Sequence, residues 1–399
     1  MVPPAPLDGL KVLDVATLFA GPVIATLMAD FGADVIKVEH PRGDALRGFG
    51  WQKDGLSLWW ALISRNKRCV TLDLNQPRGQ TLLKELAADA DVLIENFRPG
   101  TMERWGLGYE ELKAVNPRLI MVRVTGFGQD GPYRDRPGFG TLAEAMSGFA
   151  EINGYPDGPP TLPTLALADV VCALFGTFAS MFALYHRDAK GTGQGQMIDL
   201  SIYEPFFWIL GPQALVYDQL GIVQGRTGNR APFAAPRNAY RARDGRWLAL
   251  SASAQSIAER VMRLVGRADV AAEPWFRNHT GRVKHADELD EIIGGWIGER
   301  SSEEVLRTFE EFQAAIAPIY SIADIMLDPQ YRARETITTH VDPRLGPVKI
   351  QNVIPRLSET PGRLRHLGPD LGAHNREIYV DKLGYSEYEI EAWRKAGIV

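Results

Sequence analysis

Residues 10–39 read LKVLDVATLFAGPVIATLMADFGADVIKVE, and this stretch decides the fold class. Leu10–Ala16 is apolar and contains β-branched residues, which predicts a buried strand. Pro22–Phe31 has helical composition, Gly32–Ala33 ends that helix, and Asp34–Glu39 is typical of a second strand. Two strands joined by a helix at this spacing indicate neighbouring parallel strands with the helix packed across them.

The same alternation of strands and helices continues to about residue 125. It predicts a parallel sheet covered by helices on both faces, which is an α/β fold. Asn75 is the expected N-cap of the helix that begins near Pro77. The further expected strands are Cys69–Leu74, Asp91–Glu95 and Leu119–Val124, and the further expected helices are Pro77–Ala90 and Tyr109–Val115.

Residues 126–164 are rich in glycine and proline and predict long loops around a short helix near Leu142–Ala150. Loops of this length inside a compact domain usually serve a function. An apolar helix follows Pro163 and carries Asp169 about one turn from its start. The stretch Leu165–Tyr185 is interrupted by this carboxylate and by small residues, which predicts a buried helix and no membrane span.

The composition changes after about residue 205, and a smaller α+β domain is expected at residues 225–325. In it, Tyr240–Arg243 and Trp247–Leu250 flank the turn residues Asp244–Gly245 and predict a hairpin. The remaining expected helices are Ser256–Val265, Ala286–Gly298 and Glu387–Lys395, the last with Ser386 as its N-cap.

The bulk composition argues against several classes of protein. A net charge of −5 is not that of a dedicated nucleic-acid binder. The two cysteines, Cys69 and Cys172, lie far apart, and the seven histidines show no metal-ligand spacing, so no metal site is expected. The N-terminal segment lacks the basic and apolar regions of a signal peptide, which predicts a cytoplasmic location and no membrane partner.

Two interpretations of Asp169 are open on pattern alone. An acidic residue in the first turn of a helix can simply interact with the helix dipole. It can also serve as an ionised nucleophile, since an ordinary carboxyl pKa of about 3.9 leaves the group charged at neutral pH.

Polar groups that follow the early strands are a second candidate site. Parallel strands end at one sheet edge, so positive side chains there predict a phosphate site, with an ordinary solvated surface as the alternative. The segment Asn96–Gly100 offers an amide, an aromatic ring and a guanidinium group to a nucleotide. The positive residues are Lys37, Arg42, Arg47, Arg65, Lys67, Arg68, Arg98 and Arg104.

An ordered series of motifs along nearly the whole chain resembles the class III CoA-transferases, the family of formyl-CoA transferase and carnitine CoA-transferase. In combination these motifs are specific for that family. They are LDGLKVLD at 7–14, AGP at 20–22, GADVIKVE at 32–39, ENFRPG at 95–100, GFGQ at 126–129, GPY at 131–133, AMSG at 145–148, LGAHN at 371–375 and LGY at 383–385.

The resemblance implies a fold and an assembly. A Rossmann-like large domain with a parallel sheet is expected at residues 1–205 and 326–399, with a connector at 206–224 and the small α+β domain at 225–325. Two copies are expected to interlock like chain links in a homodimer. No tightly bound cofactor is implied, because CoA and acyl-CoA take part as substrates.

The resemblance also implies roles for single residues. Asp169 stands at the position of the nucleophilic aspartate, which would pass through aspartyl-acyl anhydride and aspartyl-CoA thioester intermediates. His40 replaces an arginine of formyl-CoA transferase, and the segment SASAQ replaces its glycine-rich active-site loop. The loop residues are Ser251, Ala252, Ser253, Ala254 and Gln255, and the expected CoA contacts are Phe19, Ala20, His40, Leu72, Asp73, Asn75, Asn96, Phe97, Arg98, Arg104, Arg136, Gly138 and Phe139.

The stretches RPGFGTLAE at 136–144 and PPTLP at 159–163 resemble the branch that takes CoA from succinyl-CoA to a dicarboxylate such as malate or citramalate. Arg230 or Arg237 is the expected partner of the second carboxylate. The family also contains α-methylacyl-CoA racemases, but their catalytic histidine is replaced here by Phe139, which precedes Gly140. A catalytically inactive CoA-binding subunit is the remaining alternative, and the presence of Asp169 argues against it.

Overall fold

The computed structural model describes residues 4–399. The chain divides into two compact units, each with its own hydrophobic core. The first unit contains the residues up to Phe149, Leu162–Gly211 and Arg332–Val399, and the second contains Ala150–Thr161 and Pro212–Tyr331. The first unit therefore takes up segments from both ends of the chain.

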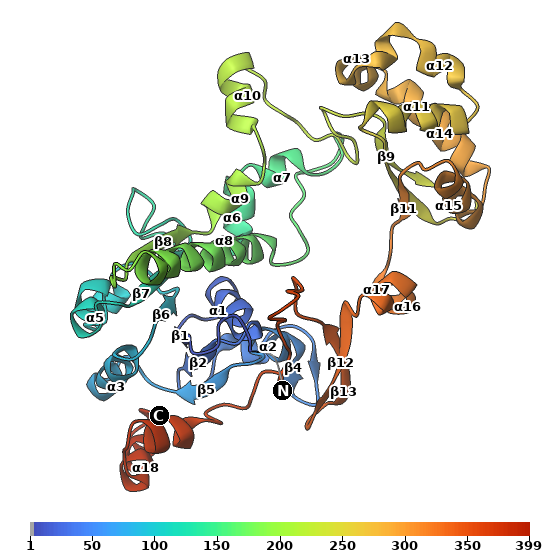
Figure 1. The fold of residues 1–399 in the computed structure, drawn as a ribbon. Helices are drawn as coiled ribbons and strands as arrows, with labels where there is room; N and C mark the ends of the chain where they lie inside the picture. The colour runs from blue at the N-terminus through green and yellow to red at the C-terminus, as the bar shows by residue number, and fades with distance from the viewer. Residues whose placement is uncertain (1–3) are drawn as a thin grey trace. The chain divides into compact units, whose positions relative to one another are not determined.

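A six-stranded parallel sheet forms the centre of the first unit (Figure 1). The strand order is β5-β2-β1-β6-β7-β8, so the sheet grows outward from β1 in both directions. The strands are β1 (Lys11–Asp14), β2 (Asp34–Glu39), β5 (Arg68–Thr71), β6 (Val92–Glu95), β7 (Ile120–Thr125) and β8 (Met197–Ser201). The predicted parallel α/β sheet is confirmed, and β8 is an edge strand that the sequence pattern did not reveal.

Alternating side chains of the strands divide the core into two layers. Val12 packs into a cluster with α1 and α8, whereas its neighbour Leu13 packs into the opposite cluster with α3 and α5. Helices therefore cover both faces of the sheet, as the sequence predicts. The bounds of these helices are α1 (Ala20–Asp30), α3 (Pro77–Ala87), α5 (Tyr109–Val115) and α8 (Leu167–Leu184).

The connections that leave β1 and β6 diverge, because β1 pairs with β2 on one side and with β6 on the other. In open parallel sheets, ligands bind outside the carboxyl ends of the strands at such a reversal of direction. The fold thus marks the segments after β1 and β6 as the place to look for a site.

The C-terminal segment completes the first unit beside β5. Oδ1 of Asn375 accepts a hydrogen bond from the Thr71 amide at 2.9 Å, and the Tyr379 hydroxyl donates to the Thr71 carbonyl at 2.8 Å. The hairpin of β12 (Ile337–Asp342) and β13 (Gly346–Gln351), which the sequence pattern did not reveal, precedes this segment. The chain ends with α18 (Glu387–Lys395), which Ser386 caps as predicted.

The second unit contains a three-stranded antiparallel sheet in the order β11-β10-β9. The predicted hairpin is confirmed as the pair β9 and β10. Helices pack against this sheet and bury apolar side chains such as Val261, Ile293 and Phe309. The elements are β9 (Arg237–Arg241), β10 (Trp247–Ser251), β11 (Ile316–Pro318), α11 (Gln255–Leu264), α14 (Ala286–Gly298) and α15 (Ser302–Glu311).

The predicted N-cap of α3 is wrong. The helix begins at Pro77 after Gln76, and the side chain of Asn75 donates a hydrogen bond to Oδ1 of Asp73 at 2.9 Å. The same oxygen of Asp73 accepts from the Asn75 backbone amide at 3.0 Å, which is the geometry of an Asx turn. Asn75 therefore belongs to the turn before the helix and leaves the helix end uncapped.

Among residues 4–399, the helical segment Leu167–Ala189 is long and apolar enough to cross a membrane by length and composition, with a mean hydropathy of 1.9. In the structure, α8 within this segment packs against α1, β7 and β8, and 39% of its apolar window is buried. A core helix passes the same test of length and composition, so the segment is only weak support for a membrane span.

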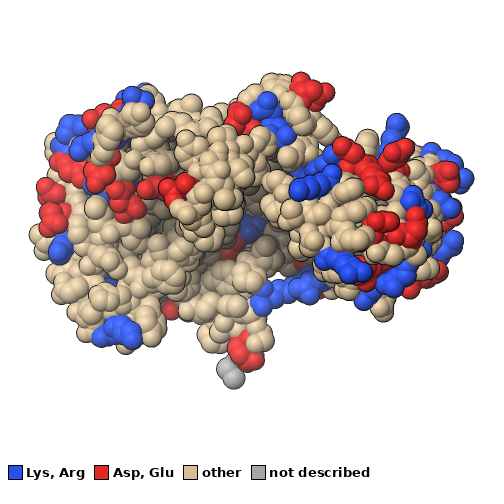
Figure 2. Space-filling model, turned by 90° about the horizontal axis from the view of Figure 1, so that it is seen from above, with Lys and Arg blue, Asp and Glu red and all other residues tan. Residues whose placement is uncertain are grey.

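Charged side chains of both signs are interspersed on the face seen in Figure 2. That face carries no broad basic area of the kind that attracts nucleic acids.

Candidate active site

A cavity of about 1030 Å³ opens in the first unit where β1, β6 and β7 end. Its wall contains the segment after each of these strands, together with the starts of α6 (Gly140–Met146) and α8. Among the described residues that line the cavity, only Glu144 and Asp169 have ionisable side chains. The cavity therefore lies at the sheet edge that the topology marks, and its described wall contains two carboxylic residues and no lysine, arginine or histidine.

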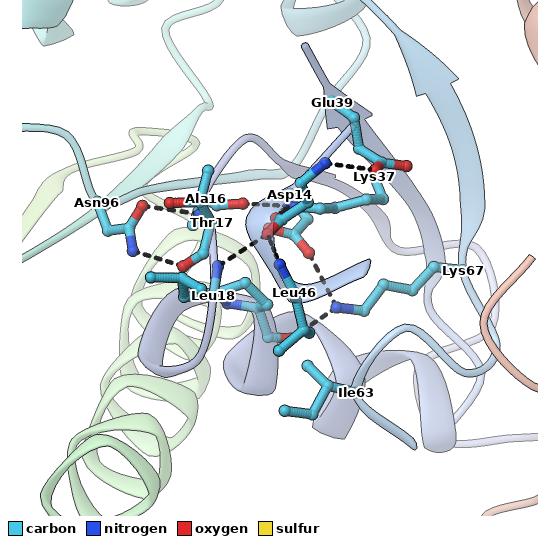
Figure 3. Close-up of polar contacts among 12 residues, drawn as sticks. Asp14, Ala16, Thr17, Leu18, Lys37, Glu39, Leu46, Ile63, Lys67 and Asn96 are labelled. Atoms are coloured by element: carbon cyan, nitrogen blue, oxygen red, sulfur yellow. Dashed lines mark hydrogen bonds and ion pairs between the residues drawn. The ribbon is translucent and has the colours of Figure 1, made fainter. Parts of the chain in front are cut away.

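The turn Thr17–Ala20, between β1 and α1, forms one wall of the cavity. Leu18 has a φ of 62°, a left-handed conformation that is unusual for a leucine. Asn96 holds this turn, as Figure 3 shows: its Nδ2 donates to the Thr17 carbonyl at 2.8 Å, and its Oδ1 accepts from the Thr17 amide at 2.8 Å. Both hydrogen bonds fix the backbone directly before the strained leucine.

Four buried charged side chains support the same turn, and Figure 3 labels three of them, Asp14, Lys37 and Lys67. Nζ of Lys67 lies 2.9 Å from Oδ2 of Asp14, and Nζ of Lys37 lies 3.1 Å from Oδ2 of Asp44. Lys37 also donates a hydrogen bond to the Ala16 carbonyl, and Oδ1 of Asp44 accepts one from the Leu18 amide at 3.3 Å. All four charged side chains are at most 1% exposed, so they form a paired charge cluster under the cavity wall.

Opposite charges decide how this paired charge cluster ionises. Burial alone would lower the pKa of Lys37, but the carboxylates of Asp14 and Asp44 raise it above its usual value. Burial alone would raise the pKa of Asp44, but the Lys37 ammonium group and the Leu46 amide lower it. The pKa of Lys67 is lowered by burial, which the charge of Asp14 only partly offsets.

Asp169 lies in the first turn of α8, and its carboxylate faces the cavity. Burial raises the pKa of this carboxyl to about 6, and the negative charge of Glu144 contributes in the same direction. A Cβ atom added at Gly140 would overlap with Oδ2 of Asp169, so any larger residue there would displace the carboxylate from this position. At neutral pH Asp169 remains mostly ionised and more basic than an exposed aspartate.

Glu144 lies in α6 and is only 3% exposed, although it contributes to the cavity wall. Its Oε1 accepts a hydrogen bond from the backbone amide of Ala168 at 3.2 Å. Ala168 directly precedes Asp169, so this contact ties α6 to the first turn of α8. Among residues 4–399, neither Glu144 nor Asp169 has a lysine, arginine or histidine within ion-pair distance.

Two loop segments approach each other closely beside the end of β7. A Cβ atom on Gly126 would lie 2.5 Å from the Cα atom of Gly138, and both glycines line the cavity. Side chains at either position would push the segments apart and displace Phe139 and Gly140. The close approach of the two segments therefore explains why glycine stands at positions 126 and 138.

The structure brings some of the predicted site residues into the cavity and leaves others outside its wall. Asp169 lines the cavity. Five of the expected CoA contacts also line it: Phe19, Ala20, Asn96, Gly138 and Phe139. Phe19 packs edge-to-face against Phe49 and Trp59, with ring centroids 5.2 Å apart in each pair. The expected contacts that do not line the cavity are His40, Leu72, Asp73, Asn75, Phe97, Arg98, Arg104 and Arg136.

Most of the residues outside the cavity wall follow the carboxyl ends of β2, β5 and β6 and share the sheet edge with it. Nε2 of His40 lies 3.7 Å from Oδ1 of Asp73, which links the ends of β2 and β5. Leu72 is 2% exposed and belongs to the core. Arg136 stacks on the Tyr133 ring, with its guanidinium carbon 3.6 Å from the ring centroid.

Of the eight positive residues considered as a phosphate-attracting cluster, five are paired with acidic residues of the chain. Arg47 pairs with Glu39 at 2.7 Å, and Arg65 pairs with Asp30 at 2.5 Å. Each of these charges is neutralised inside the protein, and a neutralised charge attracts a distant anion only weakly. The five paired residues are Lys37, Arg47, Arg65, Lys67 and Arg68, while Arg42, Arg98 and Arg104 form no ion pair within residues 4–399.

The predicted active-site loop, Ser251–Gln255, lies in the second unit between β10 and α11. Arg282, which is fully buried, donates to the Ser253 carbonyl at 2.9 Å and to the Ala235 carbonyl at 2.7 Å. It also donates to the side chain of Gln255. The segment is therefore tied to the body of the second unit by one arginine.

The expected cations for a second substrate carboxylate differ in their partners. Arg230 forms ion pairs with Asp287 and Asp290, each at 2.6 Å, so its charge is already compensated. Arg237 forms no ion pair within the described part of the chain. Both line a smaller cavity of about 230 Å³ in the second unit.

Sequence reasoning did not single out Glu144, Gly140 or the paired charge cluster. Glu144 and Gly140 lie inside the quoted motif stretch 136–144, but nothing in the pattern gives them a role. Lys37 in the middle of a buried strand was the available signal for the cluster, because lysine is almost never fully buried unless it is paired.

Comparisons with known proteins agree with one another. The model described as CoA-transferase family III matches residues 7–375. The chain is 43% identical over 390 residues to a succinyl-CoA–D-citramalate CoA-transferase of Chloroflexus aurantiacus, covering 97% of this chain and 96% of that relative. It is 42% identical over 399 residues to the beta subunit of a succinyl-CoA–L-malate CoA-transferase of the same organism, covering 99% and 98%. A solved CAIB/BAIF family protein from Brucella suis superposes with a TM-score of 0.81 at 32% identity, over 94% of this chain and 99% of that one.

Proposed function

Because this chain belongs to CoA-transferase family III, we propose that it transfers CoA from succinyl-CoA to a dicarboxylate acceptor such as malate or citramalate. The names of the relatives with more than 40% identity support this donor and these acceptors. The observation that carries the proposal is the position of Asp169, a carboxylate of raised pKa in a cavity at the carboxyl end of the sheet.

In the proposed mechanism, Asp169 is the nucleophile. One carboxylate oxygen attacks the thioester carbonyl of succinyl-CoA, the C–S bond breaks, and CoA leaves as the thiolate while a mixed anhydride forms. The thiolate then attacks the aspartyl carbonyl carbon, which releases succinate and gives an aspartyl-CoA thioester. The acceptor carboxylate repeats these two steps in reverse and carries CoA away, so Asp169 is regenerated without a net proton transfer.

The environment of Asp169 suits this role. A nucleophile gains reactivity as its basicity rises, and a pKa of about 6 combines higher basicity with ionisation at neutral pH. A racemase of this family would need a histidine as well as an aspartate beside the acyl α-carbon, and the described cavity wall holds two carboxylates and no histidine. Transfer chemistry is therefore the better match to the geometry.

For CoA itself we propose the sheet edge that runs from His40 through Asn96 to Arg104. Arg98 and Arg104 are exposed and form no ion pair within residues 4–399, which leaves both guanidinium groups available to phosphate. Phe97 packs against Trp105 with ring centroids 5.1 Å apart, which offers an aromatic surface to the adenine.

The decisive experiment incubates the protein with succinyl-CoA and each acceptor and detects acceptor-CoA by mass spectrometry. We expect citramalyl-CoA or malyl-CoA to form, and Asp169→Ala to lose about 10,000-fold or more in kcat with its fold intact. Hydroxylamine should trap an adduct on Asp169 in the native enzyme. Retention of a tenth of the activity by the variant would reject Asp169 as the nucleophile.

Substrate class needs its own test, because the acceptor separates branches of this family. We expect acetate and formate to be poorer acceptors than malate or citramalate by about 10- to 150-fold, if a cation binds the second carboxylate. Of the two arginines predicted for that contact, Arg230 is compensated by two aspartates, whereas Arg237 forms no ion pair within residues 4–399. Equal use of acetate would refute the dicarboxylate proposal and leave the transferase proposal standing.

We further propose that the chain forms an interlocked homodimer. Helix α8 leaves Leu174, Phe178 and Phe182 more than 40% exposed, and α10 (Gln213–Leu220) buries none of its residues. A partner subunit would cover these apolar side chains, and the relatives named as alpha and beta subunits make a heteromer the alternative. Light scattering on dilution tests the interlocked homodimer, since linked subunits cannot separate into folded monomers and a folded monomer of this chain would contradict the proposal.

The domain boundaries at residues 205, 224 and 325 and the cytoplasmic location stay predictions. Limited proteolysis followed by mass spectrometry would locate the exposed connectors and test the boundaries.

A further inference from the structure

The cavity beside Asp169 contains a second acid for which the proposed mechanism has no use. Glu144 is 3% exposed, yet no lysine, arginine or histidine lies within ion-pair distance of it among residues 4–399. Buried carboxylates are ordinarily paired with a cation, because an isolated buried charge is costly. This protein follows that rule elsewhere: Asp14 is paired with Lys67, and Glu95 is paired with Arg123 at 2.7 Å.

The contacts of Glu144 connect it to the nucleophile by two routes. Its Oε1 accepts the hydrogen bond of the Ala168 amide at 3.2 Å, one residue before Asp169. Helix α6, which carries Glu144, also begins at Gly140, whose backbone lies directly against Oδ2 of Asp169. The position of α6 therefore determines both the start of α8 and the space around the carboxylate.

We propose that Glu144 is a positioning residue for the proposed transfer reaction: it fixes the first turn of α8 through the Ala168 amide, and its negative charge repels the Asp169 carboxylate in the resting enzyme. Formation of the aspartyl-CoA thioester removes one of the two negative charges from the cavity, because the thiolate is consumed in the new bond and the charge leaves with the released succinate. The repulsion is then relieved, so Glu144 favours the covalent intermediates over the free carboxylate. No proton moves to or from Glu144 in this step.

The ionisation of Asp169 is consistent with this role. Burial is the main cause of its raised pKa, and the charge of Glu144 is the second cause. The Cys172 thiol, one turn further along α8, has a raised pKa because of burial and remains neutral. Ionisable groups on the elements packed against α8 have partners of their own: Asp30 with Arg65, Arg123 with Glu95 and Glu103, Asp199 with the Gln129 amide, and Glu204 with Ser201.

Two substitutions separate the position of Glu144 from its charge. Glu144→Gln keeps the length and an oxygen that accepts from Ala168, but removes the charge. Glu144→Asp keeps the charge and shortens the reach. The measurement is the pH profile of kcat/KM for succinyl-CoA, whose acid limb reports the ionisation of the free enzyme. Ionisation of the substrate affects all variants equally and cancels in the comparison.

We expect Glu144→Gln to move the acid limb to lower pH by about 0.5 to 1 unit, because the repelling charge is gone. Its kcat should fall about threefold to tenfold with an unchanged KM for succinyl-CoA, and less trapped adduct should accumulate without acceptor. Glu144→Asp should keep the acid limb in place while kcat falls. The matched control is Glu110→Gln, an exposed glutamate on α5 that should leave both quantities unchanged.

An acid limb that does not move in folded Glu144→Gln overturns the inference. If that variant does not fold, a displaced acid limb in Glu144→Asp overturns it instead. The inference rests on the nucleophilic role of Asp169, and the outcomes remain distinguishable. Activity of Asp169→Ala defeats the proposed function, whereas an inactive Asp169→Ala with an unmoved limb in Glu144→Gln defeats only the role of Glu144.

Discussion

Two parts of the cavity wall differ in whether their buried charged side chains are paired with opposite charges. Under the turn Thr17–Ala20, the paired charge cluster sets each of two lysines against an aspartate. At the start of α8, Asp169 and Glu144 share the cavity wall without a cation in the described part of the chain. Both sides consist of side chains with little exposure, so burial alone does not explain the difference.

This difference in pairing is expected between charged side chains that stabilise the fold and charged side chains that take part in a reaction. A buried ion pair fixes geometry, and the loss of one partner leaves an uncompensated charge that destabilises the fold. A like-charged pair destabilises the resting state, and this cost is retained where it favours a reaction. The wall held by Asn96 and Lys37 thus shapes the cavity, and the wall at the start of α8 carries the proposed nucleophile.

The largest expected effect is on stability, when one partner is removed from the paired charge cluster. Lys67→Met should lower the free energy of unfolding by about 3–5 kcal/mol, since Asp14 then keeps only the more distant Lys37 at 3.7 Å. Urea unfolding followed by circular dichroism measures this change. Asp169→Asn, on the opposite wall, is the comparison and should not destabilise the protein at pH 7. A loss below 1 kcal/mol for Lys67→Met would show that the cluster does not hold the fold.

The next effect concerns the space beside the nucleophile. Gly140→Ala should lower kcat about 10- to 100-fold, because the added methyl group overlaps with Oδ2 of Asp169 and displaces it. The matched control is Gly295→Ala in α14, where an added Cβ atom meets nothing within 4 Å. This substitution should leave kcat unchanged and should stabilise the helix slightly, because alanine has a higher helix propensity than glycine. Steady-state kinetics of both variants decide the point, and an unaffected kcat in Gly140→Ala would contradict the assigned geometry.

The pH dependence of stability gives a third and smaller effect. The folded-state pKa of Asp169, about 6, lies above the unfolded value of about 3.9, so the folded state binds the proton more tightly. The resulting stabilisation is complete below pH 4 and is lost as the pH rises through 6. Relative to Asp169→Asn, the native protein should lose about 1–2 kcal/mol over this interval, since partial exposure reduces the full value. Parallel pH dependences of the two proteins in urea unfolding would contradict the raised pKa.

The smallest effect tests the clamp on the cavity wall. Asn96→Ala removes both hydrogen bonds to Thr17 and should raise the KM for succinyl-CoA by about threefold to tenfold, with a smaller change in kcat. Asn96→Asp keeps only the acceptor and should give an intermediate value. A KM unchanged in both variants would mean that the turn keeps its conformation without the clamp.

Much of the fold could be predicted from the sequence because its signals are local. The apolar runs at Leu10–Ala16 and Asp34–Glu39 correspond to β1 and β2, and the Ser386 cap lies where the pattern places it. Strand β8 was missed because it lies at the edge of the sheet, where its first three residues, Met197–Asp199, are exposed or half-buried, and because its sequence, MIDLS, carries no apolar run. The N-cap prediction for Asn75 was wrong for a different reason: its side chain donates a hydrogen bond to Asp73 and does not cap the helix.

The sequence by itself determined the parallel α/β fold, the family and the position of the candidate nucleophile. Those conclusions depend on periodicity and on ordered motifs, which are properties of neighbouring residues. Only the tertiary structure decided that Lys37 and Lys67 are internal partners of aspartates and that Glu144 stands beside Asp169. Charge pairing depends on which residues meet across different strands and helices, and residues 53 positions apart, such as Asp14 and Lys67, meet only when the sheet is formed.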